Sequence, residues 1–282
     1  MSVIVLDCGN SIIKAKISRR VQGEIAFTHA IRQLTESEYE KILSRVSIKG
    51  DTKEYFRVNG KPYAAGESAE RHGIVTPRSG TARYTKDYCG VLVAISLAKF
   101  YERGREVAVF ASHPPGDVKY REDLMKSIIG EWEVETGQAK ANFQVIYANT
   151  FDEPVGGLMN VLLTEDGQHY QYPQIGDGRS LVIDIGSFTT DFLAVNPGGA
   201  VDYALARSVP LGIQSIISDF EESFRANNLE IVKNTPVLPP DRVRNAISTG
   251  IFVGGGKNHS CECIIRGKTS INSENIVQRF RK

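Results

Sequence analysis

Two stretches of the chain arrange hydrophobic and polar residues in the same order. The first begins with the apolar run Ser2–Leu6, passes through the polar turn Asp7–Ser11, and continues with Ile12–Ile17, in which apolar and polar residues alternate. A short apolar run is typical of a buried strand, and alternation is typical of a strand with one buried face. The pattern therefore predicts a β-hairpin whose tip carries an aspartate and a glycine.

The second stretch repeats this order further along the chain. The strongest apolar run, Leu181–Gly186, contains Asp184 and is followed by the polar turn Ser187–Asp191 and a returning strand, Phe192–Val195. Written out, the two segments are VIVLDCGNSIIKAKI and LVIDIGSFTTDFLAV. An internal repeat of this kind predicts two structurally related halves that face one another.

The remaining elements follow from simpler patterns. Asn59 and Gly60 favour the positive φ angles of a two-residue hairpin turn. Apolar residues at helical spacing predict helices, and short apolar runs predict buried strands. The elements predicted in this way are a hairpin over Glu54–Gly66, a loop over Arg71–Tyr84, helices over Asp87–Tyr101, Lys119–Ile129, Glu153–Leu162, Val209–Phe224 and Asp241–Ser248, and strands over Val107–Ala111 and Phe143–Tyr147.

Composition places the chain among globular proteins. The 282 residues are 41% hydrophobic and 24% charged, and this length supports two domains of ordinary size. The formal net charge is +1, so no general basic excess predicts direct binding to nucleic acid or to an anionic membrane. The sequence shows neither a leader pattern nor an apolar run of membrane length, so we expect a cytoplasmic protein.

The two aspartate-tipped turns have the composition of phosphate-binding loops. Glycine permits a close approach of the backbone to a ligand, and backbone N–H groups together with hydroxyl side chains form a concave site for phosphate oxygens. An aspartate would repel a phosphate unless a cation lies between them, and Mg²⁺ links carboxylates to phosphates in this way. Asp7 and Asp184 are therefore candidate magnesium ligands, and two such turns closing on one ligand would hold a nucleoside triphosphate.

Each of these features also has an ordinary explanation. A single Asp-x-Gly turn in a hairpin is usually only a turn, because glycine and aspartate are common turn residues. Lys14, on the strand that leaves the first turn, is either a solvated surface charge or a phosphate contact. The presence of two copies, each flanked by strands on both sides, favours the functional interpretation.

These segments resemble the phosphate motifs of the superfamily of actin, heat-shock chaperones and sugar kinases. DCGNSIIKAKI is similar to the first phosphate motif and DIGSFTTDF to the second. The segments VNGKPYAAGESAERHG, SGTARYTKDYCG and FDEPVGG resemble the bacterial actin-like proteins of the ParM/StbA plasmid-segregation type. The resemblance covers roughly Val3–Ser248, and it implies an α/β, actin-like (ribonuclease H-like) fold of two domains with the nucleotide in the cleft between them.

The resemblance also implies roles for individual residues. Asp7 and Asp184 would hold Mg²⁺ through water molecules, and Glu153 would orient the water that attacks the γ-phosphate. The alternative for Glu153 is an ordinary acidic residue in the first turn of a helix. The residues implied in binding the phosphates are Gly9, Asn10, Ser11 and Lys14 from the first motif, and Gly186, Ser187, Phe188, Thr189 and Thr190 from the second.

The C-terminal part departs from the superfamily pattern. Gly254–Gly256 superficially fits a third motif, a glycine-rich turn that contacts adenosine, but only three apolar residues precede it and Lys257–Ser260 does not read as a buried helix. The resemblance to ParM-like chains implies a long helix over Cys261–Phe280, although serine and asparagine residues weaken its helical pattern. We therefore expect an actin-like N-terminal domain over residues 1–178 and a second domain over residues 179–282 that is incomplete at its C-terminus, as in a shortened family member.

The resemblance implies a filament-forming ATPase that acts in plasmid or DNA segregation, with ATP or GTP and Mg²⁺ as its ligands. Its implied partners are further copies of itself in a head-to-tail filament, and a DNA-binding adaptor. Two alternatives stay open, namely a small-molecule kinase of the same superfamily and a non-enzymatic module that keeps the fold for binding only. A kinase would need an aspartate base at the γ-phosphate, and the sequence offers no obvious candidate.

Overall fold

The computed structural model describes residues 2–9, 12–17, 24–46, 54–71, 82–100, 105–137, 139–164, 168–228, 233, 238, 240–254 and 257–261. The chain divides into two compact units. Unit 1 comprises residues 1–182 and 193–206, and unit 2 comprises residues 183–192 and 207–282.

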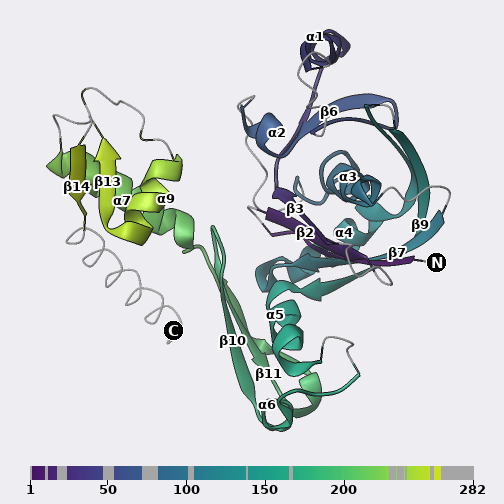
Figure 1. Cartoon of the computed structure of the whole chain (residues 1–282). Helices are drawn as coiled ribbons and strands as arrows, with labels where there is room; N and C mark the ends of the chain where they lie inside the picture. Colours follow the sequence, from purple (N-terminus) through teal and green to yellow (C-terminus); the bar gives the residue numbers. More distant parts are fainter. Residues whose placement is uncertain are drawn as a thin grey trace. The chain divides into compact units, whose positions relative to one another are not determined.

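Strands and short helices alternate along the chain (Figure 1). In chain order they are β1 (Ser2–Asp7), β2 (Ile12–Ile17), β3 (Glu24–Thr28), β4 (Ile31–Gln33), α1 (Glu36–Val46), β5 (Tyr55–Val58), β6 (Lys61–Ala65), α2 (Glu67–Arg71), η1 (Lys86–Gly90), α3 (Val91–Lys99), β7 (Arg105–His113), η2 (Pro115–Tyr120), α4 (Arg121–Ile128), β8 (Gly130–Thr136), β9 (Ala139–Asp152), α5 (Glu153–Leu162), α6 (Pro173–Asp177), β10 (Ser180–Ile185), β11 (Thr190–Val195), η3 (Pro197–Gly199), β12 (Val201–Val209), α7 (Ile213–Asn227), α9 (Pro240–Thr249), β13 (Ile251–Gly254) and β14 (Lys257–Ser260).

The large sheet of unit 1 places β1 between two partners. Its nine strands follow the order β3-β2-β1-β7-β9-β8-β5-β6-β4. β1 pairs antiparallel with β2, which closes the predicted hairpin, and parallel with β7, with Ile4 opposite Val109. The apolar side chains Ile4, Leu6 and Val109 are fully buried. Because the carboxyl ends of parallel strands meet at the same edge of a sheet, the turn at Asp7 lies beside the end of β7.

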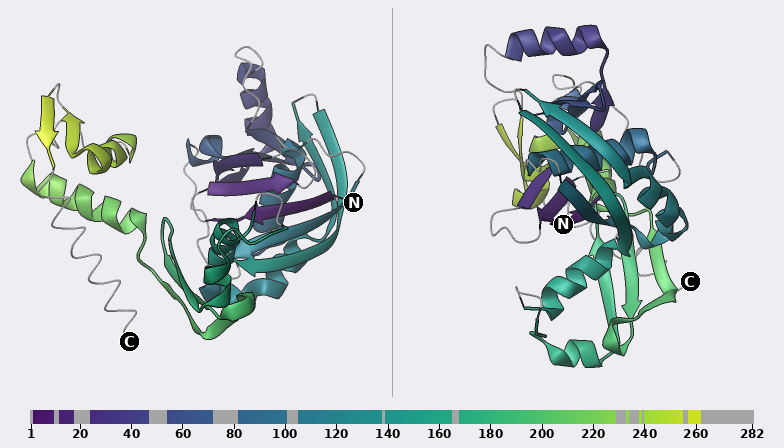
Figure 2. Two further views of the ribbon diagram at one scale, coloured as in Figure 1. Left: turned by 60° about the horizontal axis from the view of Figure 1, so that its bottom comes forward. Right: turned by 90° about the vertical axis from the view of Figure 1, so that its right-hand side faces the viewer.

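Helix α3 lies on the concave side of this sheet, which curves strongly around it (Figures 1 and 2). Every residue from Val91 to Ala98 is buried, as expected for a helix that is apolar on all sides. At the start of the helix, a Cβ atom on Gly90 would lie 2.3 Å from the carbonyl oxygen of Ser127 and 2.7 Å from the Trp132 ring. Only glycine therefore allows α3 to approach the neighbouring helix and strand so closely.

The opposite end of the sheet carries a smaller apolar core. Tyr39, Ile42 and Leu43 of α1 pack there against β6 and α2. The hydroxyl of Thr35 accepts a hydrogen bond from the N–H of Glu38, and the Glu38 carboxylate accepts one from the N–H of Thr35. This reciprocal capping box fixes the beginning of α1, which is seen at the top of the right-hand view in Figure 2.

The second repeat belongs to a sheet of three strands in the order β10-β11-β12. Its central strand, β11, is buried along its whole length. Leu158 and Leu162 of α5 form one apolar cluster with Leu193 and Val195 of β11. The returning strand of the second repeat is thus the centre of the small sheet, and β10 and β12 are its edges.

A separate core holds the C-terminal elements of unit 2. Ile217, Phe220 and Phe224 of α7 pack with Val243 of α9 and Phe252 of β13. The ring centroids of Phe224 and Phe252 are 4.4 Å apart. The apolar stripe that predicts this helix in the sequence is therefore the surface that forms the core.

Several predicted boundaries differ from the structure, and two of the differences have clear local reasons. The helix predicted from Val209 begins only at Ile213, because Val209 is the last residue of β12 and the helix starts after Gly212. The strand predicted over Phe143–Tyr147 is the middle of the longer β9. The elements that were not predicted include strands β3, β4, β8, β12, β13 and β14 and helices α1, α2 and α6.

Gly254, the first glycine of the glycine-rich segment near the C-terminus, belongs to one of two paired strands. Gly254 is the last residue of β13 and lies opposite Lys257 of β14 in an antiparallel pair. A returning strand therefore follows the glycines, where an adenosine-binding motif would require a helix. Cys261 is fully buried in the core of unit 2, and the helix predicted over Cys261–Phe280 otherwise lies outside the described residues.

Candidate functional site

The polar turn of the first repeat, Asp7–Ser11, is called the first turn below, and that of the second repeat, which follows Asp184, is called the second turn. The aspartate of the first turn is the last residue of β1. Asp7 lies opposite Lys14 across the hairpin, and the Lys14 ammonium is 3.5 Å from the Asp7 carboxylate. Both side chains remain partly exposed, at 41% for Asp7 and 57% for Lys14. Such an exposed pair contributes about 1 kcal/mol or less to stability, so the two groups are available to a ligand.

Ser112 connects this aspartate to the neighbouring strand. Its hydroxyl donates a hydrogen bond of 3.0 Å to the Asp7 carboxylate and accepts one of 2.9 Å from the N–H of Cys8. The parallel pairing of β1 with β7 causes this contact, because Leu6 lies opposite Ala111 and the two following residues are therefore neighbours. Ser112 thus fixes both the carboxylate and the start of the turn.

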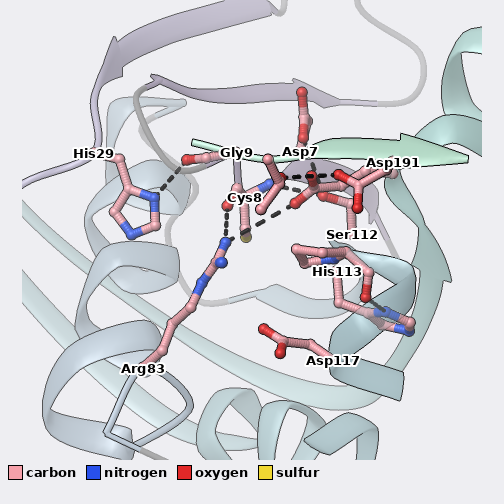
Figure 3. A network of polar contacts seen from close by, with 12 residues as sticks. Asp7, Cys8, Gly9, His29, Arg83, Ser112, His113, Asp117 and Asp191 are labelled. Carbon is pink, nitrogen blue, oxygen red and sulfur yellow. Dashed lines mark hydrogen bonds and ion pairs between the residues drawn. The ribbon is translucent and has the colours of Figure 1, made fainter. Parts of the chain in front are cut away.

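Two buried side chains hold the carbonyl oxygens of the first turn (Figure 3). The Arg83 guanidinium donates to the carbonyl of Cys8, and Nδ1 of His29 donates to the carbonyl of Gly9. A trans peptide bond points its C=O and its N–H in opposite directions. The carbonyl of Cys8 shares its peptide with the N–H of Gly9, so the Arg83 contact turns that N–H away from Arg83. A turn whose N–H groups face away from the core is suited to an anion.

His29 is neutral at physiological pH in this position. Burial, together with the nearby positive charge of Arg83, lowers the pKa of His29 to about 4. A carbonyl can only accept, so the proton of the neutral ring lies on Nδ1, which faces Gly9. Arg83 is only 1% exposed and keeps its charge, because a guanidinium is not deprotonated in proteins. A fixed positive charge therefore lies directly behind the first turn.

Two thiols lie beneath the same turn. Cys8 and Cys89 are both buried, and neither forms a disulfide. The hydrogen bond that the Cys8 thiol donates to the Cys89 sulfur, followed by burial, raises the pKa of Cys8 well above its ordinary value. The thiol of Cys8 is thus protonated and packs as a small apolar group, as the sequence suggests for a cysteine at the end of an apolar strand.

Glu153 is the first residue of α5 and lies within reach of the same arginine. Its carboxylate is 3.9 Å from the Arg83 guanidinium, and the side chain is 12% exposed. The preceding residue, Asp152, accepts a hydrogen bond from the Tyr203 hydroxyl and lies 3.6 Å from the ring of His113. Pro154 at the start of the helix needs no hydrogen-bond partner for its nitrogen, which favours a helix beginning at this point.

In the second turn, the carbonyl oxygens accept hydrogen bonds from backbone N–H groups. The N–H groups of Ile213 and Gln214, in the first turn of α7, donate to the carbonyls of Gly186 and Ser187. Gly212 makes this approach possible, because a Cβ atom there would lie 2.6 Å from the Gly186 carbonyl oxygen. The helix end therefore fixes the turn without a buried charge.

Hydroxyl groups fix the remaining part of the second turn. The N–H of Gly186 donates to the carbonyl of Thr189 and closes the turn. The Thr190 hydroxyl donates to the carbonyl of Leu211, and the Thr189 hydroxyl donates to the Asp191 carboxylate. Thr190 is fully buried, so its hydroxyl supports the turn from inside, whereas Thr189 lies nearer to its surface.

The structure brings together only part of the implied site within each unit. Asp7, Gly9, Lys14 and Glu153 all belong to unit 1, and Arg83 contacts both the first turn and Glu153. The implied residues of unit 2 are Asp184, Gly186, Ser187, Phe188, Thr189 and Thr190, and Asn10 and Ser11 lie outside the described residues.

Sequence analysis missed three residues that shape the first turn. They are His29, Arg83 and Ser112, each of which contacts residues 7–9. Arg83 is 75 residues from Cys8 along the chain and lies at the end of a stretch that reads as a loop. A signal was present only for Ser112, which directly follows the apolar run predicted to be a buried strand.

The donor set of the first turn fits a hydrated magnesium ion. Asp7 offers a partly exposed carboxylate, and the Ser112 hydroxyl orients one of its oxygens. Magnesium prefers oxygen ligands, keeps several waters and is usually bound through one or two carboxylates together with phosphates. Asp7 is the residue of unit 1 that would hold the ion through water.

A family model described as actin-like proteins, N-terminal domain, matches residues 6–156, which is more than half of the chain. The matched segment contains the first turn together with Arg83, Ser112 and Glu153. The chain belongs to the family of actin-like proteins. The α/β, actin-like fold and the family resemblance inferred from the phosphate motifs are thereby confirmed.

Solved structures share the fold of this actin-like protein at low sequence identity. An archaeal actin homologue, Ta0583, in complex with ADP is 18% identical, with a TM-score of 0.70, and the match covers 100% of this chain and 81% of that chain. The actin-like protein Alp7A is 13% identical, with a TM-score of 0.71, over 99% of this chain and 79% of that one. A subunit of a 15-stranded ParM filament from Clostridium botulinum is 14% identical, with a TM-score of 0.67. This match covers 99% of this chain and 83% of that chain.

No curated protein sequence matches the chain at a significant level. Among the described residues, no helix combines the length and the hydrophobicity that a membrane span requires.

Proposed function

We propose that this actin-like protein binds a magnesium–nucleoside triphosphate with both aspartate-tipped turns and hydrolyses it. ATP is the expected nucleotide, and GTP is the alternative. Support comes from the shared fold with an archaeal actin homologue whose structure contains ADP. We further propose that the nucleotide controls self-assembly into a head-to-tail filament that acts in plasmid or DNA segregation in the cytoplasm, through a DNA-binding adaptor. The filament proposal is supported by the shared fold with a ParM filament subunit.

One observation carries this proposal. The two copies of the repeat hold equivalent carbonyls by donors that come from their own unit. In the first copy the Gly9 carbonyl accepts from His29, and in the second the Gly186 carbonyl accepts from the N–H of Ile213. In a solvated hairpin turn, water satisfies such carbonyls, so neither a distant side chain nor a helix end is needed to contact them. A turn that must present its N–H groups to an anion has such a reason.

The candidate site residues would have separate roles in phosphoryl transfer. This reaction needs positioning and neutralisation of charge more than covalent catalysis. Mg²⁺, when bound, supplies positive charge beside the phosphates, and Asp7 and Asp184 would hold its water ligands. Lys14 would contact a phosphate oxygen as a point charge. Glu153 would align the attacking water, and its neighbour Arg83 would orient that carboxylate.

The roles of Glu153 and of the nucleotide are tested by the variant Glu153→Gln. The amide keeps the size of the side chain but removes its charge, so we expect ATP turnover to fall by roughly 100-fold or more while nucleotide affinity changes little. Asp87→Asn is the matched control, because Asp87 is an exposed carboxylate that pairs with Lys61 away from the turn.

Assembly is measured on the same variants by light scattering and pelleting with ATP and Mg²⁺. If nucleotide controls assembly, a variant that binds ATP but does not hydrolyse it should form longer-lived filaments than the parent chain. Equal turnover of Glu153→Gln and Asp87→Asn would contradict the catalytic role of Glu153. A chain that stays monomeric at all concentrations with ATP and Mg²⁺ would contradict the filament proposal.

A further inference from the structure

The two copies of the repeat differ in the neighbours of their first strand. β1 has a strand on each side, because β2 pairs with it antiparallel and β7 pairs with it parallel. Its counterpart β10 is the outer strand of the order β10-β11-β12, so among the described residues only β11 pairs with it. In the part of the chain that the structure describes, no strand of the second copy takes the position that β7 has beside β1.

β10 combines its outer position in the sheet with an exposed apolar face. Leu181, Ile183 and Ile185 project from one face and are 49%, 52% and 54% exposed. Natural edge strands are usually protected by lysine, proline or a bulge, because their free N–H and C=O groups can pair with another chain. The sequence of β10, SLVIDI, contains neither lysine nor proline, and its single charged residue is Asp184. Its composition therefore suits a strand that is covered on both edges.

The first copy shows which kind of strand fits this edge. β7 runs parallel to β1, with Val3 opposite Ala108 and Val5 opposite Phe110. Its central residues, Val107–Ala111, are all apolar. The residue that follows them, Ser112, donates to the carboxylate of Asp7. The matching segment beside β10 would be an extended run of apolar residues followed by a hydroxyl near Asp184.

We propose that the outer edge of β10 binds an extended apolar segment of a second polypeptide, which adds to the sheet as a strand parallel to β10. The main-chain hydrogen bonds would supply affinity, and the apolar side chains would cover Leu181, Ile183 and Ile185. This inference does not depend on nucleotide binding, since it rests on the sheet order and on the exposed side chains alone.

A second copy of β10 fits this position less well than a different segment. Two β10 strands related by a two-fold axis normal to the sheet would run antiparallel, unlike β1 and β7. Two parallel copies would be related by an axis along the strands, which would put their apolar faces on opposite sides of the sheet. In neither arrangement does the second copy reproduce the pairing that the repeat shows.

The test uses a peptide that copies the natural neighbour of β1. A fluorescein-labelled peptide with the sequence of residues 105–113, REVAVFASH, is titrated with the full chain without nucleotide or Mg²⁺, and its fluorescence anisotropy is recorded. The control peptide carries Val109→Pro, which removes a backbone donor from the middle of the strand. We expect saturable binding of the first peptide and at least about tenfold weaker binding of the second.

Two variants of the chain locate the binding edge. Ile183→Lys puts a charge on the exposed face of β10 and should weaken binding of the peptide at least about tenfold. Leu205→Lys makes the same change on β12, the opposite edge strand, where Leu205 is 44% exposed, and should leave binding unchanged. Circular dichroism and thermal unfolding check that both variants are folded.

Three results would overturn the proposal. The first is the absence of saturable binding, and the second is equal binding of the peptides with and without proline. The third is concentration-dependent self-association of the chain that Ile183→Lys abolishes and that excess peptide does not displace, because a second copy would then occupy the edge. Failure of any nucleotide assay affects none of these outcomes, so the two proposals fail separately.

Discussion

The carbonyl oxygens of Gly9 and Gly186 occupy equivalent positions in the two copies of the repeat, and both accept hydrogen bonds from donors far away in the sequence. His29 supplies the donor in the first copy, and the backbone N–H of Ile213 supplies it in the second. The same backbone geometry is thus produced by two unrelated means. That convergence indicates that the orientation of the turn, and not the identity of the donor, is what the protein needs.

Arg83 is the residue whose loss should disturb the first turn most. In Arg83→Met the Cys8 carbonyl loses its donor and the Glu153 carboxylate loses its buried partner. Leaving buried polar or charged groups without a partner typically costs about 3 kcal/mol or more, so urea unfolding should show a loss of that order. Nucleotide affinity, measured on the folded fraction, should also fall.

Arg57→Met is the matched control for Arg83. Arg57 donates to the Glu36 carboxylate at the surface, where an ion pair contributes about 1 kcal/mol or less. Equal losses of stability in the two arginine variants would show that the buried position of Arg83 has no special importance.

His29 makes stability depend on pH in a defined direction. Its pKa is about 4 in the folded chain and near the ordinary value of 6.5 in the unfolded chain. The unfolded chain therefore binds the extra proton first as the pH falls, so stability is fully present above pH 6.5 and is lost between pH 6.5 and 4. A difference of this size corresponds to roughly 3 kcal/mol.

The variant His29→Gln isolates this contribution, because the amide can still donate to the Gly9 carbonyl but does not titrate. Urea unfolding at pH 7 and pH 4.5 should show a smaller loss for His29→Gln than for the parent chain. The exposed His169→Gln variant should behave like the parent. A pH dependence that is the same in all three chains would exclude His29 as its source.

Ser112 should matter for the metal more than for the fold. In Ser112→Ala the Asp7 carboxylate and the N–H of Cys8 both lose a partner. We expect a loss of stability of about 1–2 kcal/mol and a clear increase in the Mg²⁺ concentration needed for nucleotide binding, because the carboxylate is no longer oriented.

Ser96→Ala separates these two effects. Ser96 is equally buried, but its hydroxyl donates to the carbonyl of Leu92 within α3. This variant should lose a similar amount of stability with no change in the Mg²⁺ requirement. A parallel change of the Mg²⁺ requirement in both serine variants would refute the link between Ser112 and the metal.

Gly212 should be intolerant of any side chain. A Cβ atom at this position would lie 2.6 Å from backbone atoms of Gly186, Ser187 and Phe188, so Gly212→Ala must push the second turn away from α7. Overpacking of this kind costs about 1–3 kcal/mol. Thermal unfolding should show this loss, and it should be accompanied by weaker nucleotide binding.

Gly157→Ala provides the opposite expectation. Gly157 lies inside α5 with no atom within 4 Å of the added methyl position. Alanine should therefore leave stability unchanged or raise it by roughly 0.5–1 kcal/mol, because it favours the helix over the unfolded chain. A gain of stability in Gly212→Ala would show that the second turn is not packed as described.

The sequence predicts the parts of the fold that depend on local pattern. The strand–turn–strand units around Asp7 and Asp184 were predictable because apolar runs and small turn residues specify them directly. The core face of α7 was equally predictable, since Phe220 and Phe224 belong to one helical stripe. The beginning of α7 was not predictable. An apolar residue such as Val209 fits either the start of a helix or the end of a strand, and it is the last residue of β12.

Only the site residues that lie close together in the sequence were predictable. Asp7, Gly9 and Lys14 belong to one hairpin, and the repeat indicates their counterparts. Arg83 and His29 could not be found in this way, because their contacts with the turn depend on how distant segments pack in unit 1. A buried arginine in a polar, glycine-rich stretch has the same local sequence as a solvated one.

The most direct test of the proposed function is calorimetric titration of the chain with ATP, with and without Mg²⁺. The parent chain should bind ATP with Mg²⁺ and lose most of that affinity without the metal, and Asp7→Ala and Asp184→Ala should each lose it even when Mg²⁺ is present. Asp87→Ala should bind like the parent. Binding of ATP that is unchanged by both Asp7→Ala and Asp184→Ala, or no binding by the folded parent chain, would contradict the assignment of the two turns to one metal-bound nucleotide.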